Sequence, residues 1–131
     1  MNILFVHPLF PGQFGPLARH LASTSEHCVK ALCTGAPDGR GDPAIDGLEM
    51  VIYGADVVPG RPRDDVLAGT DDFIRHAASL AIAAERLKAS GFYPDVVYCH
   101  VSWGPGAFLH LVFPQARYIK YCEWFYNETG G

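Results

Sequence analysis

The sequence predicts an α/β fold with three layers: a doubly wound, mostly parallel sheet of about five strands between two layers of helices. Three observations lead to this prediction. Strand-like and helix-like segments alternate along the chain, the strand-like segments are nearly continuous apolar runs, and the longest helical segment carries one apolar stripe. Such alternation joins parallel strands through right-handed crossovers, and continuous apolar runs are typical of strands buried on both faces. We expect one domain, residues 1–131, with the strand order 3-2-1-4-5.

The first half of the chain contributes three predicted strands. Residues 2–7, NILFVH, form the first strand, and a helix follows it. Residues 28–33, CVKALC, form the second strand, and a loop rich in Gly, Pro and Asp separates it from the third strand at residues 48–53. The apolar face of the helix between the first two strands consists of Phe14, Leu17, Ala18, Leu21 and Ala22.

The second half contributes the longest helix and two more strands. Thr70 is the expected N-cap of this Ala-rich helix, which ends before Gly91. Residues 96–100, VVYCH, form the fourth strand. A short helix led by glycines is expected within residues 103–113, and residues 117–122, RYIKYC, form the fifth strand.

Composition and charge exclude several classes of function. The net charge of −4 and the pI near 5.8 argue against a nucleic-acid-binding protein, which needs a clustered basic face. The apolar runs are far shorter than the roughly 20 residues of a membrane span. The N-terminus also lacks the basic and long apolar regions of a signal peptide. We therefore expect a cytoplasmic protein that binds no nucleic acid.

The four cysteines give no indication of a metal site or a redox site. Cys28, Cys33, Cys99 and Cys122 form no CxxC pair, and none has metal-ligand spacing with a histidine. We expect buried, reduced thiols that act as small apolar side chains, and no bound metal.

Two histidines lie at the ends of predicted strands. In doubly wound sheets, ligands bind beyond the carboxyl ends of the strands, where the strand order reverses. In the predicted order this point lies between the first strand, which ends at His7, and the fourth, which ends at His100. Glu123 and Trp124 follow the fifth strand at the same edge. The sequence therefore predicts that two imidazoles, a carboxylate and an indole converge there.

The turn after the first strand is a second candidate for ligand binding. Pro16 lacks an N–H and fits the first turn of the following helix, which places Gln13 or Phe14 near its N-cap. The amides from Gly12 to Gly15 would then point into the crevice and favour an anion or a sugar oxygen. The alternative is that the two glycines only make a tight turn.

Glycines also flank Pro105, at Gly104 and Gly106. Without side chains they would let a ligand approach the backbone amides, or they would simply form a compact turn.

Two common classes of enzyme site are missing from the sequence. The first turn offers G-x-x-G in place of G-x-G-x-x-G, and no acidic residue ends the second strand, so dinucleotide binding is not expected. There is no G-x-S-x-G nucleophile motif. The histidines other than His7 and His100 are expected to have no chemical role.

Three stretches carry a resemblance to a known family: ILFVHPLFPGQFGPLARHLA at residues 3–22, GFYPDVVYCHVSWGPGAFL at residues 91–109 and FPQARYIKYCEWFY at residues 113–126. Together they resemble the N-terminal half of a GT-B glycosyltransferase. They look most like a bacterial branch of glycosyltransferase family 4 with HxxFPGQF, then PDVV followed by H and WG, and finally YCEF or YCEW. The resemblance covers nearly the whole chain in order, and the combination of motifs is specific.

The resemblance implies a retaining transferase of the hexosyltransferase type, with two Rossmann-like domains. Such an enzyme moves a sugar from a nucleotide-sugar, its co-substrate, to a sugar or lipid-linked acceptor, and needs no metal or other cofactor. The N-terminal domain mainly holds the acceptor, and the C-terminal domain holds the nucleotide. Peripheral association with a membrane would accompany a lipid-linked acceptor.

The resemblance also implies roles for single residues. The turn at residues 7–14 would lie under the donor phosphates and the acceptor, and His100 would reach the transferred sugar. Glu123 and Trp124 match a segment that faces the cleft. The expected catalytic residue is His100, and the expected substrate-binding residues are His7, Gly12, Gln13, Phe14, Trp103, Gly104, Glu123 and Trp124.

The chain departs from the family pattern at two places. It ends at Gly131 without the basic residue and the E-x(7)-E segment that hold the donor, and Pro16 stands where relatives usually carry another residue. We therefore expect an acceptor-side domain, truncated before its donor domain, that cannot catalyse transfer alone. A non-catalytic, flavodoxin-like binding or signalling module is the alternative, although FVHPLF lacks the acidic pair of a receiver domain.

The fifth strand is expected at an edge of the sheet, with Tyr and Ile side chains exposed. Exposed strand edges pair readily with other chains, so we expect a homodimer through this edge.

Overall fold

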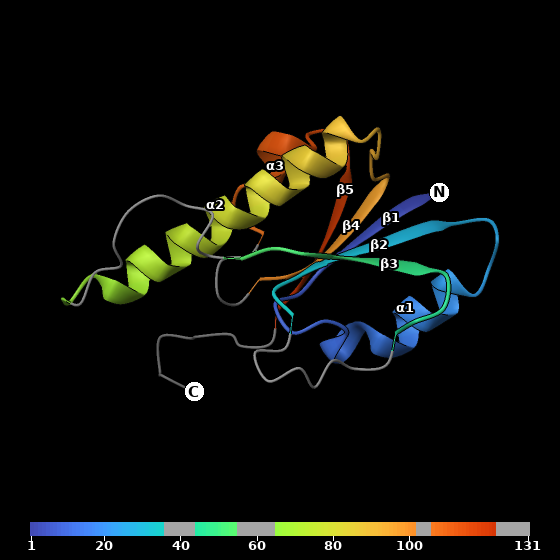
Figure 1. Cartoon of the computed structure of the whole chain (residues 1–131), viewed down its shortest axis with the longest axis horizontal. Helices are drawn as coiled ribbons and strands as arrows, with labels where there is room; N and C mark the ends of the chain where they lie inside the picture. The colour runs from blue at the N-terminus through green and yellow to red at the C-terminus, as the bar shows by residue number, and fades with distance from the viewer. Residues whose placement is uncertain (36–43, 55–64, 102–105, 123–131) are drawn as a thin grey trace.

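Five strands form one parallel sheet in the order β3-β2-β1-β4-β5 (Figure 1). The computed structural model describes residues 1–35, 44–54, 65–101 and 106–122. The strands are β1 (Asn2–Val6), β2 (Cys28–Cys33), β3 (Leu48–Ile52), β4 (Val96–His100) and β5 (Arg117–Tyr121). All four neighbouring pairs are parallel. The predicted Rossmann-like α/β class and the predicted strand order are confirmed.

Helices cover both faces of this sheet (Figure 1). A short 3-10 helix, η1 (Gly12–Phe14), leads directly into α1 (Gly15–Ala22) on one face. The long α2 (Ala68–Ala89) and the short α3 (Leu109–Val112) pack against each other on the opposite face. Each face of the sheet is therefore paired with helices, which gives the three layers.

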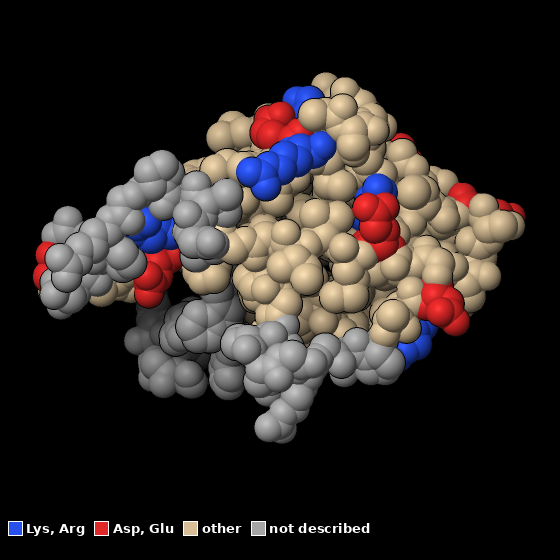
Figure 2. Space-filling model, in the orientation of Figure 1, with Lys and Arg blue, Asp and Glu red and all other residues tan. Residues whose placement is uncertain are grey.

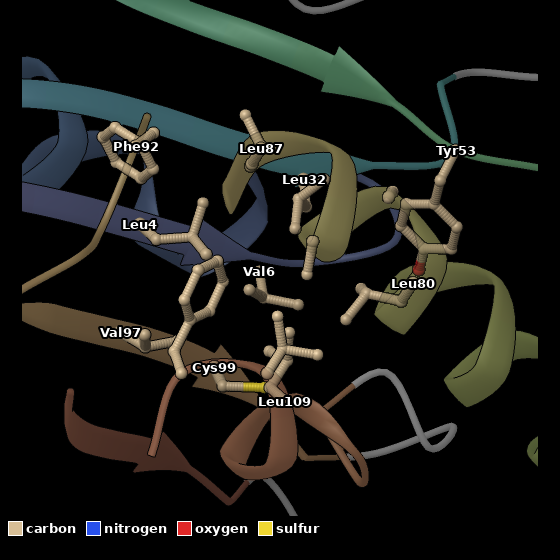
Figure 3. Packing of buried hydrophobic residues seen from close by; sticks show 14 residues of the cluster. Leu4, Val6, Leu32, Tyr53, Leu80, Leu87, Phe92, Val97, Cys99 and Leu109 are labelled. Atoms are coloured by element: carbon tan, nitrogen blue, oxygen red, sulfur yellow. The ribbon is translucent and has the colours of Figure 1, made fainter. Parts of the chain in front are cut away.

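Two apolar clusters join the layers. The cluster between the sheet and α2 and α3 is shown in Figure 3, where side chains from all three elements point toward one another. Burying one such side chain stabilises the fold by about 1.5–3 kcal/mol. Fully or almost fully buried members of this cluster are Leu4, Val6, Leu32, Leu80, Val97, Cys99 and Leu109. On the α1 face, the second cluster consists of Ile3, Phe5, Phe10, Phe14, Ala18, Ala22, Val29, Ala31, Cys33 and Ile45.

The start of α2 differs from the prediction. Thr70 is not its N-cap, because the helix begins at Ala68 and Leu67 occupies the cap position. Asp65 turns the chain earlier: its Oδ1 accepts a hydrogen bond from the Leu67 N–H at 3.0 Å, and its backbone carbonyl accepts one from the Ala68 N–H at 2.9 Å. The predicted stop is confirmed, since Gly91 has φ +90° just beyond the helix.

The helix after β4 is also shorter than expected. It comprises Leu109–Val112, and residues 106–108 form a turn before it. Pro114 follows closely and disfavours helical geometry in the residue before it. The first part of the predicted helix, residues 103–105, lies outside the described residues.

Two of the cysteines are not buried, so that expectation is corrected. Cys33 and Cys99 are buried thiols, whereas Cys28 and Cys122 are exposed. Cys28 opens β2 at the amino end of the sheet, and Cys122 follows the last residue of the edge strand β5. Neither position is covered by a helix layer.

The surface carries mixed charges. On the face shown in Figure 2, acidic and basic side chains lie next to one another, and the described residues form no extended basic area there. Within the described part of the chain, no helix is long and apolar enough to cross a membrane.

The strand β5 lies at one edge of the sheet, as expected. Its side chains Ile119 and Tyr121 are 43% and 40% exposed. A homodimer through this edge stays a prediction.

We expect Leu80→Ala to lower the free energy of unfolding by about 2–5 kcal/mol, because it leaves a cavity under α2. Leu80 is completely buried. Ile82→Ala is the matched control on the same helix, since Ile82 is 36% exposed, and its effect should stay below about 1 kcal/mol. Urea unfolding of both variants measures the difference. Equal losses would contradict the packing of α2 on the sheet.

The cysteines should differ in their reactivity. Burial raises the pKa of the Cys99 thiol to about 12, and burial also raises the pKa of Cys33. Both thiols therefore stay protonated at pH 8, where the thiolate is the reactive form. Iodoacetamide should modify Cys28 and Cys122 in the native protein and all four cysteines in urea. Mass spectrometry reads the result, and native labelling of Cys99 as fast as Cys28 would contradict it.

Candidate functional site

Two imidazoles lie side by side at the carboxyl edge of the sheet. In the parallel pairing of β1 with β4, Val6 is the partner of Cys99, so His7 and His100 follow at adjacent places. Their ring centroids are 4.8 Å apart, and the ring planes meet at 71°. The structure thus brings together the two histidines that the sequence singled out, from strands about ninety residues apart in the chain.

Hydrogen bonds fix the orientation of the His7 ring. Its Nδ1 accepts a hydrogen bond from the Leu9 N–H at 3.0 Å, and its Nε2 lies 3.0 Å from Oε1 of Gln13. Because the backbone N–H can only donate, a neutral His7 carries its proton on Nε2 and donates it to the Gln13 oxygen. The predicted site residue Gln13 therefore acts as a partner of His7.

Gly12 lies directly against the same ring. Its φ is +46°, and a Cβ at this position would come within 2.7 Å of Cε1 and Nε2 of His7. Glycine is required here for both reasons, the left-handed backbone and the close approach. The space beside its Cα is thus filled by the His7 ring.

Two amides of the turn are paired within the protein, which corrects the expectation that the amides of residues 12–15 point into the crevice. The Phe14 N–H donates to the Pro11 carbonyl at 2.9 Å, and the Gly15 N–H donates to the Gly12 carbonyl. These two amides are used inside η1, because the chain forms a 3-10 turn before α1. Pro16 does lie in the first turn of α1, as expected.

Aromatic rings surround the histidine pair. The buried ring of Phe14 lies 6.0 Å from the rings of both His7 and Tyr121, and 5.5 Å from Phe5. Tyr121 is the register partner of His100, and their rings are 5.7 Å apart. Tyr121 was not predicted as a site residue, although the side-chain alternation of β5 beside β4 indicates that it lies next to His100.

The burial of His100 is unusual for its residue type. Its side chain is 2% exposed, and it and Ser79 are the buried polar side chains among the residues that the structure describes. His7 and Tyr121 are more accessible, and they form the exposed part of this cluster.

The chemistry of the cluster suits polar, uncharged ligands. Imidazoles donate and accept hydrogen bonds and change charge near neutral pH. Aromatic rings offer flat apolar surface beside them. Such a combination can bind hydroxyl groups on one side of a ring-shaped ligand and its apolar atoms on the other.

Four predicted site residues, Trp103, Gly104, Glu123 and Trp124, lie outside the described residues. Within the described part of the chain, no group of three or more His, Cys, Asp and Glu residues could hold a metal ion. The expected independence from metals stays a prediction.

One comparison with known proteins gives a match. The family model described as glycosyl transferase family 4 group matches residues 25–131. The match includes His100 and Tyr121, whereas β1, His7 and the Gly12 turn precede it. No curated protein of similar sequence was found.

We expect Gly12→Ala to destabilise the protein by about 2 kcal/mol or more. An alanine in the left-handed backbone conformation costs roughly 1–2 kcal/mol, and its Cβ would also collide with the His7 ring. Thermal or urea unfolding measures this loss. The ring signals of His7 and His100 should shift together in NMR spectra.

Two other glycines are controls for this substitution. A Cβ at Gly91, φ +90°, would meet no heavy atom within 4 Å, so Gly91→Ala measures the backbone strain alone. Gly69 lies in α2, and a Cβ there would meet no heavy atom within 4 Å, so Gly69→Ala should raise the free energy of unfolding by about 0.5 kcal/mol. A loss in Gly12→Ala no larger than in Gly91→Ala would show that the His7 ring does not pack there.

Proposed function

The chain belongs to the glycosyl transferase family 4 group, and from this membership we propose that it forms the acceptor-side domain of a retaining glycosyltransferase. Membership at this level means glycosyl transfer. Beyond it, we propose a hexosyl transfer from a nucleotide-sugar donor to a sugar or lipid-linked acceptor. The reaction takes place in the cytoplasm, with peripheral membrane association where the acceptor is a lipid.

The observation that carries this proposal is the pair His7 and His100. It lies where the strand order reverses, between β1 and β4, at the edge where ligands of doubly wound sheets bind. We propose that this pair holds the hydroxyl groups of the transferred sugar. His7 offers the more accessible ring, and His100 lies beneath it as the expected catalytic residue.

The aromatic surroundings of the pair support a sugar as the ligand. The rings next to it are those of Phe14 and Tyr121. Sugars combine hydroxyl groups with apolar C–H surface, which fits imidazoles beside aromatic rings. We propose that a second domain supplies the contacts to the charged nucleotide, and that no metal is needed.

The expected contributions of Trp103, Gly104, Glu123 and Trp124 are part of the same proposal. We propose that they bind the substrate together with His7, Gly12, Gln13 and Phe14. Gly12 acts indirectly, because it lets the His7 ring take its position.

We expect His100→Ala to lower kcat/KM for sugar transfer by about a hundredfold or more, because a positioned imidazole typically contributes at least that much. The assay uses the enzyme in which this chain is joined to its donor domain. Circular dichroism and thermal unfolding of the variant verify that it still folds.

His20→Ala is the matched control, because His20 is exposed on α1, away from the sheet edge. It should leave transfer unchanged. The isolated 131-residue chain is the second control and should show no transfer, since we propose that the donor contacts lie in another domain. Wild-type-like turnover in a folded His100→Ala variant would remove His100 from the site.

A further inference from the structure

We propose that the α2 and α3 face of the same sheet edge binds an amphiphile with an anionic head and an apolar tail. This site is separate from the histidine pair and goes beyond the proposed function. It is a cavity of about 360 Å³ between α2, α3 and the ends of β4 and β5. Its volume lies within the range of small-molecule sites, roughly 300–1,000 Å³.

The alternation of side chains along β4 and β5 separates the two sites. Cys99 and Lys120 are register partners that line the cavity, and the next pair, His100 and Tyr121, points to the opposite face. Each site therefore has its own residues, although both lie at one edge of the sheet.

The walls of the cavity are mainly apolar. Phe73 contributes from α2, Val101 from the end of β4, Ala107 from the turn before α3, and Tyr118 from β5. The Tyr118 hydroxyl donates a hydrogen bond to the Phe113 carbonyl at 3.1 Å, so this group is already paired. A hydrocarbon tail against these side chains would remove apolar surface from water.

Lys120 provides the positive charge of the cavity. In the described part of the chain no ion pair or side-chain hydrogen bond is found for Lys120. The other two lysines with described surroundings are engaged: Lys30 pairs with Glu49 at 2.6 Å, and Lys88 donates to the Val112 carbonyl at 3.1 Å. His110 also lines the cavity and can add a second hydrogen-bond donor.

The floor of the cavity does not neutralise this charge. Cys99 lies beside Lys120, but burial raises the pKa of its thiol to about 12, so the thiol stays neutral at physiological pH. A single anionic head at Lys120 with its tail along Phe73 and Val101 satisfies both the charge and the apolar walls.

The test is an NMR titration of the full 131-residue chain with octyl phosphate, octanoate, octyl glucoside and inorganic phosphate, each below the concentration of micelle formation. We expect saturable shifts of the amides at residues 106–110 and 118–120 with the two anionic amphiphiles. Octyl glucoside lacks the charge and inorganic phosphate lacks the tail, so both should bind at least about tenfold more weakly. The order of octyl phosphate and octanoate identifies the preferred head group.

Substitutions on β5 test the role of the charge. Lys120→Met should weaken octyl phosphate binding about tenfold or more, because it removes a charge-assisted hydrogen bond. Lys120→Arg keeps the charge and the donor, so it should retain most of the binding. Arg117→Met removes the same charge from the other face of the same strand and should leave binding unchanged. Both positions are exposed, so the variants should fold.

Several results would overturn the proposal. These are the absence of saturable shifts at the cavity, equal binding of octyl glucoside and octyl phosphate, or equal weakening by Lys120→Met and Arg117→Met. The titration involves no sugar transfer, so a negative titration would leave the proposed function untouched. Equally, loss of transfer in His100→Ala would not bear on amphiphile binding.

Discussion

The parallel pairing of β1 with β4 is the constraint on which the rest of the structure depends. These strands are about ninety residues apart in the chain, and their register from Ile3 with Val96 to Val6 with Cys99 makes them leave the sheet at the same edge. The order of the sheet reverses at this pair, since β2 and β3 lie on one side and β5 on the other. Any residue that follows either strand is thereby placed at the position where this class of fold binds ligands.

The sheet edge is organised differently on its two faces. On the α1 face, Gly12 and Gln13 hold the His7 ring against His100. On the α2 face, Lys120 stands over a buried neutral thiol and apolar walls. The alternation of side chains along β4 and β5 places His100 and Tyr121 on one face of the sheet, and Cys99 and Lys120 on the other. The proposed sugar and the proposed amphiphile would then approach the same edge from two sides.

Long-range order was predictable from the sequence, whereas several local details were not. Continuous apolar runs and the alternation of elements indicated the strand order, and with it the meeting of His7 and His100, because burial on both faces leaves few arrangements for such strands. The start of α2 was missed because the Asp65 carboxylate accepts a hydrogen bond from the Leu67 N–H and turns the chain before Thr70. The role of Gly12 was seen only in part. A sequence does not show that the ring of His7, five residues earlier, lies against Gly12 and is held there by Gln13. Tyr121 joined the site through its register with His100, which depends on the pairing of two strands and on no local motif.

The central claim is that His7 and His100 act together on the transferred sugar. A double-mutant cycle of His7→Ala, His100→Ala and both substitutions, measured as kcat/KM in the enzyme that contains this domain, tests it most directly. We expect the two losses to be strongly non-additive, with a coupling energy of at least about 1 kcal/mol, because each ring depends on the other for its position. Losses that add within about 0.5 kcal/mol, or no loss in either single variant, would contradict it.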